Sequence, residues 1–228
     1  MITLTAEIEI KGENPSPFVL KESQLGSSTF GTNIDTTFVV DKRNILSLES
    51  EIRDRADADK PSFGVISSGG SMSFKDKNGM FESYANIGSL RGGEPIKVFL
   101  MNSINHNKQQ VGAYYAADWD YDNDNRSVSV SFNDDLERMQ GIATPTFNLL
   151  EQDGVALLDL YSKAKEIAMN NGFQFDETNT SALDFMQKMK VSYAYMLSGN
   201  LWQLFDKISV ACCANVFVNR LGMVEIRR

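Results

Sequence analysis

The chain opens with strict alternation of apolar and polar residues. Ile2, Leu4, Ala6, Ile8 and Ile10 alternate with threonine and glutamate, which is the period of a strand with one buried face. The polar run that follows, from Lys11 to Pro17, predicts its end. Shorter strand-like runs recur at residues 36–40, 71–75 and 95–101.

The clearest hairpin pattern covers residues 111–132. Its first strand is predicted to place one set of side chains on a single face: Ala113, Tyr115, Ala117, Trp119 and Tyr121. The second strand matches it with Val128, Val130 and Phe132, and serines occupy the opposite face. Asn123–Asn125 supplies the turn.

Three further segments complete the first part of the chain. Residues 44–52 fit a strand and a helix face equally well, so both alternatives stay open. Residues 80–87 are spaced as a short helix. Residues 134–140 resemble a helix start, because acids in the first turn are favoured by the helix dipole.

The pattern changes to helical spacing after about residue 145. Helices are predicted over residues 154–169, 183–195 and 201–211, the last one capped by Asn200. Short strands at 216–218 and 223–226 then form a hairpin. The sequence therefore predicts an α+β protein, with a β-rich, barrel-like domain over residues 1–146. An α+β module of three helices and a hairpin would occupy residues 147–228. Whether the polypeptide continues past Arg228 is left open.

Composition narrows the function classes. The 228 residues carry a net charge of −8, which argues against nucleic-acid binding and against docking on an anionic membrane. No apolar run approaches the roughly 18 residues that a membrane span requires, so no membrane insertion is expected.

An acidic segment at the tip of the 111–132 hairpin is the most distinctive local feature. Asp118, Asp120, Asp122 and Asp124 alternate along it, and such oxygen ligands suit Ca²⁺. The segment lacks the glycine and glutamate of an EF-hand loop in both possible registers. We therefore hold three interpretations open: a weak calcium site, a solvated acidic face, or a contact with a basic patch of another subunit.

Few residues favour catalysis. His106 is the single histidine and lies in a polar turn without the partners of a general base. Cys212 and Cys213 are adjacent, which strains a disulfide, so two reduced cysteines are expected, as in a protein made in a reducing cytoplasm. No nucleophile motif, paired-carboxylate site or phosphate-binding loop occurs. We expect no enzyme activity and no cofactor.

Two stretches together carry a family resemblance. The first runs from Pro61 through Asp76-Lys-Asn-Gly79 to the hairpin that ends near Leu136, and the second is the helix and hairpin from Leu201 to Ile226. Over roughly residues 60–140 and 200–226 the chain resembles the tail hub and baseplate structural proteins of tailed bacteriophages and prophages.

The resemblance implies a structural virion protein of the phage tail tip, hub or baseplate, made in the bacterial host cytoplasm. It also implies assembly into a ring, with a trimer favoured and a hexamer allowed, and docking to other phage tail proteins. The family supplies no catalytic residues, so none are assigned. The alternative function is a tail-associated receptor- or carbohydrate-binding adaptor, which exposed aromatic residues beside a calcium-bound loop would favour.

Three segments are candidates for the subunit interface. They are the hairpin tip with Asp120, Asp122 and Asp124, the loop from Asp54 to Asp59, and the last strand with Met223, Val224 and Ile226. The last strand is included because the chain stops inside a strand pattern, and an exposed edge invites pairing with another chain.

Overall fold

The computed structural model describes most of the chain in separate ranges. These are residues 4–15, 33–40, 43–53, 63–77, 79, 81, 92–102, 107–145, 147–149, 155–191, 194–196 and 199–228. Within them the fold is mixed α+β, as predicted from the sequence. The chain divides into two compact units. One holds Met1–Ser50 and Gly70–Phe132, and the other holds Glu51–Gly69 and Asn133–Arg228.

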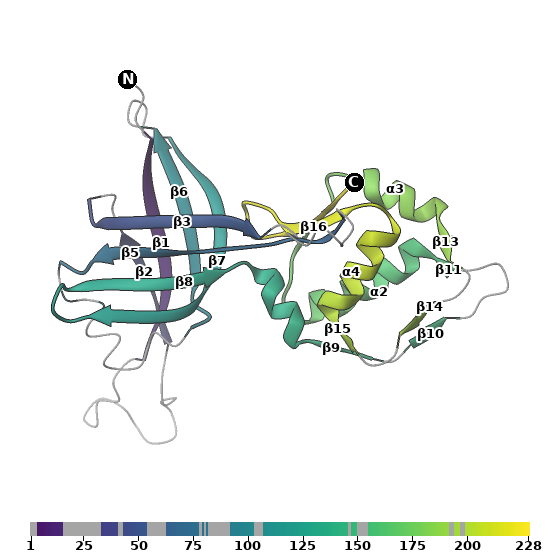
Figure 1. The fold of residues 1–228 in the computed structure, drawn as a ribbon, viewed down its shortest axis with the longest axis horizontal. Coiled ribbons are helices and arrows are strands. Elements are labelled where there is room, and N and C mark those ends of the chain that lie inside the picture. The colour runs from purple at the N-terminus through teal and green to yellow at the C-terminus, as the bar shows by residue number, and fades with distance from the viewer. Residues whose placement is uncertain are drawn as a thin grey trace, which may run out of the picture. The chain divides into compact units, whose positions relative to one another are not determined.

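A curled seven-stranded sheet forms the first unit (Figure 1). Its strand order is β2 (Asn33–Val40), β1 (Leu4–Pro15), β6 (Pro95–Asn102), β7 (Lys108–Asp122), β8 (Ser127–Asn133), β5 (Ser67–Lys75) and β3 (Ile45–Arg53). The predicted first strand is confirmed over its described residues from Leu4, and it runs on to Pro15, since Lys11–Pro15 pairs with Asn33–Thr37 of β2. The ambiguous segment at 44–52 is a strand.

The inner face of this sheet carries the core of the first unit. Buried side chains come from six strands and include Ile10, Val40, Met72, Phe74, Ile96, Val98, Ala116, Val128, Val130 and Phe132. In β8 the predicted alternation is confirmed: Val128, Val130 and Phe132 are buried, and Ser129 and Ser131 are exposed. Phe74 packs edge-on against Phe81, with ring centroids 4.8 Å apart.

The predicted inward face of β7 is wrong over its first half. Gly112 and Ala116 are buried there, whereas Ala117 and Asp118 are both exposed before Trp119 and Tyr121 turn inward again. The register against β6 also shifts between Val98 and Phe99, which leaves Val111 as an extra residue. Each irregularity moves the following side chains to the other face of the strand, as a bulge does. A prediction from strict alternation therefore places the residues of the first half of β7 on the wrong face.

The second unit contains three α-helices and a 3₁₀ helix among its described residues. They are η1 (Asp135–Gly141), α2 (Leu157–Asn170), α3 (Ser181–Lys188) and α4 (Leu201–Ala211). Asn200 and Gln203 cap α4 reciprocally, and α4 has the predicted bounds. The helix predicted over 183–195 ends at Lys188. Lys190–Val191 leaves the helix to pair with Val155–Ala156.

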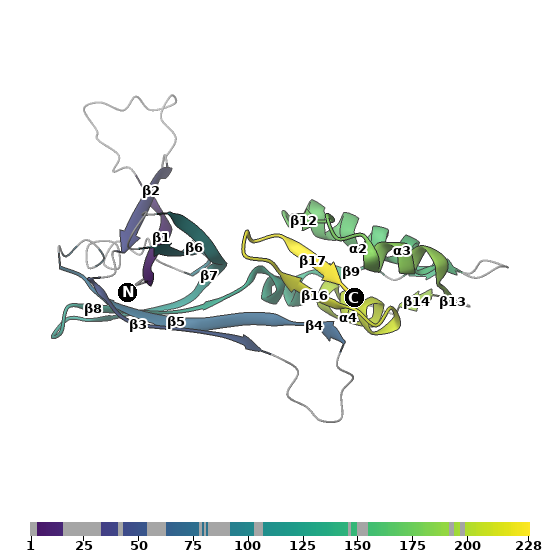
Figure 2. The same ribbon diagram turned by 90° about the horizontal axis from the view of Figure 1, so that it is seen from above.

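A four-stranded sheet packs against these helices. Its order is β12 (Phe175–Asp176), β17 (Val224–Arg227), β16 (Asn215–Val218) and β4 (Gly64–Val65). Figure 2 shows the predicted β16–β17 hairpin beside α2 and α4. Val65, Val216, Val224 and Ile226 share one core with helix residues such as Leu160, Leu204, Phe205 and Ile208.

Three short antiparallel pairs flank the helices. They are β9 (Ala143–Thr144) with β15 (Gly199–Asn200), β10 (Phe147–Leu149) with β14 (Ala194–Met196), and β11 (Val155–Ala156) with β13 (Lys190–Val191). The first two pairs share one register, and the third is offset from it. No helix in the described ranges is long and apolar enough to cross a membrane.

The two units differ from the predicted division at residue 146. The second unit begins at Asn133 and also takes in Glu51–Gly69, which supplies the edge strand β4. That strand pairs in parallel with β16, joining Gly64 to Asn215 and Val65 to Val216. Pairing between strands about 150 residues apart cannot be predicted from local periodicity, because periodicity indicates only which face of a segment is apolar.

Candidate assembly surfaces

The acidic hairpin tip is exposed, and its side chains mainly hold the turn. Asp122 accepts hydrogen bonds from the backbone N–H groups of Asp124 and Asn125, both at 3.0 Å, and from Asn125 Nδ2 at 2.7 Å. The side-chain hydrogen bond from Asn125 is the main reason that the pKa of Asp122 lies below its ordinary value. Asp118 accepts from the backbone N–H of Trp119.

The structure does not bring the four predicted calcium candidates together. In the part of the chain that it describes, no three His, Cys, Asp or Glu side chains are grouped as metal ligands. Asp118, Asp120, Asp122 and Asp124 are each exposed, and Asp122 already uses both carboxylate oxygens on the turn. The tip therefore presents its carboxylates to solvent, and the weak calcium site, the solvated face and the subunit contact all stay predictions.

The last strand is not an edge, in contrast to the prediction for Met223, Val224 and Ile226. β17 lies between β12 and β16, and Val224 and Ile226 are only 2% and 3% exposed in the core of the second unit. Met223 is half-buried. The strand pattern at the chain end marked a core strand, because its second partner, Phe175–Asp176, comes from about 50 residues earlier.

The opposite face of β16 and β17 carries a charged and aromatic group. Glu225 is 4% exposed and accepts from Nε and Nη2 of Arg227 at 2.9 and 2.5 Å. The Arg227 guanidinium lies 5.5 Å from the centre of the Phe217 ring. Both Arg227 donors reach the same oxygen, Oε1, so the guanidinium makes a forked, charge-assisted contact with one side of the buried carboxylate.

The edge strands β2 and β3 carry the exposed apolar residues that sequence reasoning missed. β2 and β3 each have one neighbour in the described sheet. Val39 in β2 is 57% exposed, and Leu46 in β3 is 55% exposed. In the sequence, only Leu46 could have indicated this exposed surface. It is an apolar residue that does not share the helical spacing of Ile45 and Leu48, both of which pack on the core.

The two cysteines are free, and they differ in exposure. Cys212 is buried and Cys213 is exposed. Burial raises the pKa of the Cys212 thiol to about 11, which keeps it protonated and unreactive. Cys213 ends α4 with φ +50°, while Ala214 N–H donates to Ser209 O across the helix end. His106 and the loop Asp54–Asp59 lie outside the described residues.

The aromatic side chain beside the acidic strand faces inward. Trp119 is half-buried and its indole N–H donates to Glu94 at 2.9 Å. Among the side chains that the structure describes, Phe63 is the one exposed aromatic residue, at 37%. The exposed aromatic platform that would favour a carbohydrate-binding adaptor is not formed by Trp119.

Comparisons with known proteins find a likeness in fold. The sequence matches no family profile and no curated protein. Among solved structures, the 43 kDa tail protein of prophage MuSo2 from Shewanella oneidensis has a TM-score of 0.50 and 13% identity, over 98% of this chain and 56% of that one.

Two further structures show lower scores. The Francisella PdpA–VgrG complex has a TM-score of 0.49 and 16% identity, over 98% of this chain and 28% of that one. The tail protein of Neisseria meningitidis MC58 has a TM-score of 0.44 and 10% identity, over 99% of this chain and 50% of that one.

The chain therefore shares the fold of a prophage tail protein. The resemblance inferred from residues 60–140 and 200–226 is confirmed at this level, and the likeness extends over almost the whole chain. The chain spans 56% of the length of the MuSo2 tail protein.

Proposed function

We propose that this chain is a structural protein of a phage tail tip, in a hub or baseplate, and not an enzyme. The fold shared with the MuSo2 tail protein carries the proposal. The protein would act in the virion tail after synthesis in the bacterial host cytoplasm, by forming a ring with its own copies and docking to other tail proteins. A trimer is the favoured ring and a hexamer the alternative.

The two edge strands of the seven-stranded sheet, as far as the structure describes their pairing, support the self-assembly step. An edge strand presents unpaired N–H and C=O groups, and long edges with apolar side chains readily pair with another chain. β2 and β3 are eight and nine residues long, and each carries one of the exposed residues Val39 and Leu46. Because one patch differs from the other, contact between them is heterologous, and such contacts close into rings when the rotation allows it.

The charge of the acidic tip also favours one arrangement of the copies in the assembly. The exposed carboxylates at the β7–β8 tip would repel one another in a like-to-like contact, so they favour a head-to-tail arrangement in which they meet basic residues. The effect of this contribution would fall with rising salt, because the tip is solvent-exposed.

Lysine substitutions at the two edges test the proposal. We expect Val39→Lys and Leu46→Lys to shift the native mass, measured by light scattering, toward the monomer, because a charge on an edge strand opposes pairing. Met169→Lys is the matched control, since Met169 is 55% exposed but lies on α2. Equal masses for the edge variants and the control would contradict assembly through these edges.

The adaptor alternative predicts a different result. A receptor- or carbohydrate-binding adaptor would bind glycans on an array, and Ca²⁺ would strengthen that binding if the acidic tip held the ion. The inward-facing Trp119 and the separated carboxylates do not favour it. We therefore expect no glycan signal above background with or without Ca²⁺.

A further inference from the structure

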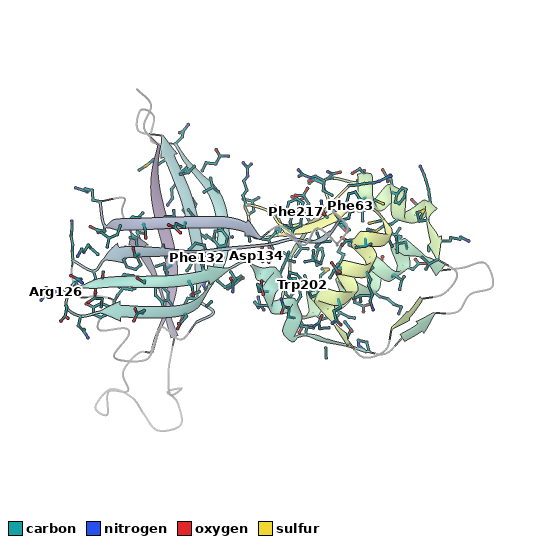
Figure 3. The ribbon with its side chains drawn as sticks, in the orientation of Figure 1. Phe63, Arg126, Phe132, Asp134, Trp202 and Phe217 are labelled. Carbon is teal, nitrogen blue, oxygen red and sulfur yellow. The ribbon has the colours of Figure 1, made fainter. Side chains whose placement is uncertain are left out.

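The chain passes between its two units three times. The passages follow Ser50, Gly69 and Phe132. They lie within or at the end of β3, β5 and β8, which are neighbours in the seven-stranded sheet (Figure 1). The first residues after the last passage are Asn133 and Asp134, and Figure 3 labels Phe132 and Asp134 on either side of it.

Asp134 joins the ends of two of these strands. Its Oδ2 accepts from Ser68 N–H at 2.5 Å and from Ser68 Oγ at 3.0 Å, and its Oδ1 accepts from Leu136 N–H at 3.1 Å. Its own backbone N–H donates to Ser68 O at 2.8 Å. One residue therefore makes three contacts with Ser68, which directly precedes the Gly69–Gly70 passage, and also caps η1.

The surroundings make this carboxylate depend on its donors. Asp134 is only 2% exposed, and a buried charge is tolerated when hydrogen bonds replace the lost water. Desolvation still raises its pKa to about 6, against the opposing effect of the Ser68 and Leu136 donors.

Glu137 on η1 is the charged group that acts on Asp134, and further charged groups lie along η1 and beside β4. On η1, Glu137 accepts from Ser67 Oγ, and Asp135 pairs with Arg138. On α4, Asp206 accepts from Val65 N–H at 3.2 Å. The described residues of β5 next to Asp134 are Ser67 and Ser68, which carry no charge.

We propose that Asp134 is a latch that holds the end of β8 and the start of β5 together where the chain passes from one unit to the other. When the hydrogen bonds of Asp134 are intact, the backbone at Gly69 and at Phe132 unfolds locally only together with η1. When they are lost, the backbone at each of these two positions unfolds locally by itself, while the cores of the two units stay folded. The latch goes beyond the proposed tail function and does not depend on it.

Amide hydrogen exchange tests this latch in the full chain. In Asp134→Ala we expect the amides of Ser68 and Leu136 to exchange about tenfold or more faster, because each loses a charged acceptor. The amides of α2 and α4 should change less than about twofold, since local opening leaves the core closed. Ser68→Ala removes only the hydroxyl contact and should give a smaller rise at the same amides.

Asp135→Asn is the control, because it alters the neighbouring carboxylate, which pairs with Arg138 and makes no contact with Ser68. The latch is overturned if Ser68 and Leu136 exchange no faster in the Asp134 variant than in this control. An equal rise over α2 and α4 would also overturn it, since that result describes general destabilisation. If Asp134→Ala does not fold, Ser68→Ala decides by the same comparison.

Discussion

A single buried carboxylate sets the most specific expectation at the residue scale. The pKa of Asp134 is about 6 in the folded chain, because burial penalises its charge, and its ordinary value is about 3.9 in an unfolded chain. A raised pKa means that the folded state holds the proton more tightly. The stabilisation that comes from binding a proton at Asp134 is therefore full below about pH 4 and is lost as the pH rises through about 6, while the hydrogen bonds that the ionised carboxylate accepts remain.

Asp134→Asn should remove this pH dependence. Between pH 7 and pH 5 we expect the free energy of unfolding of the wild-type chain to gain about 1 kcal/mol from Asp134, and the variant should lack that gain. The chain has two tryptophans, Trp119 in the first unit and Trp202 in the second. Urea unfolding followed by Trp202 fluorescence in a Trp119→Phe background measures the unit that contains Asp134.

The neighbouring acid Asp135 does not disturb this comparison. Burial also raises its pKa, with Arg138 acting in the opposite direction, so it adds pH dependence of the same sign to both proteins and cancels in their difference. Equal pH slopes for the wild-type and Asp134→Asn chains would show that Asp134 titrates at its ordinary pKa.

At the scale of elements, the approach of the Gly92–Gly93 turn to β7 depends on glycine. Gly92 and Gly93 have φ of +90° and +92°. Gly93 N–H donates to Ala116 O, and Ala116 N–H donates to Glu94 O. A Cβ at Gly92 would lie 2.9 Å from Ala117 O, whereas a Cβ at Gly93 would meet nothing within 4 Å.

The pair Gly92→Ala and Gly93→Ala therefore separates backbone strain from contact. Both variants place alanine at positive φ, which costs about 1 kcal/mol or more. Gly92→Ala adds a clash with backbone and should cost about a further 1–3 kcal/mol. Thermal unfolding of the first unit, followed by Trp119 in a Trp202→Phe background, compares them. Equal losses would mean that the turn can move away from Ala117.

Element type was predictable wherever an element is regular. The amphipathic spacing and the Asn200 cap defined α4, and the alternation of Val128, Val130 and Phe132 defined the inner face of β8. β7 was assigned the wrong face because two irregularities interrupt its alternation, and such bulges carry no periodic signal. The strand at 45–53 stayed ambiguous because its partner β5 had to be known first.

The candidate site was less predictable than the fold. The acidic tip was found from its composition, but the fixing of Asp122 in the turn depends on backbone geometry. The strand with Val224 and Ile226 is predicted as an exposed edge because its second partner, β12, lies about 50 residues earlier in the sequence. The sequence places Asp134 only at a helix start, since its contacts with Ser68 join residues 66 positions apart.

At the scale of the whole molecule, long-range pairing determines the organisation. The second unit borrows β4 from a segment that begins after Ser50, so neither unit is one continuous piece of the chain. Asp206 accepts from the N–H of Val65, and Asn215 from that of Gly64. Side chains of the second unit thus satisfy two backbone donors of the borrowed strand.

A fragment of the second unit that is cut from the rest of the chain should be less stable than the same unit in the full chain. A fragment that begins at Asn133 would lack β4 and leave the Asp206 and Asn215 acceptors without those donors. We expect its free energy of unfolding, followed by Trp202, to fall by several kcal/mol, because a buried Val65 and its hydrogen bonds are lost together. A peptide of residues 60–69 added in trans should restore part of the loss, and a peptide with Val65→Asp should not. Unchanged stability of the fragment would contradict the role of β4.

The native mass tests most directly whether this chain assembles from its own copies, as proposed for a tail protein. Light scattering on the full chain at tens of micromolar, with negative-stain imaging of the same peak, gives both size and symmetry. We expect a closed ring of three copies if the chain is a hub protein, or of six copies if it forms the ring next to the hub. A strictly monomeric peak with no rings in the images would contradict self-assembly.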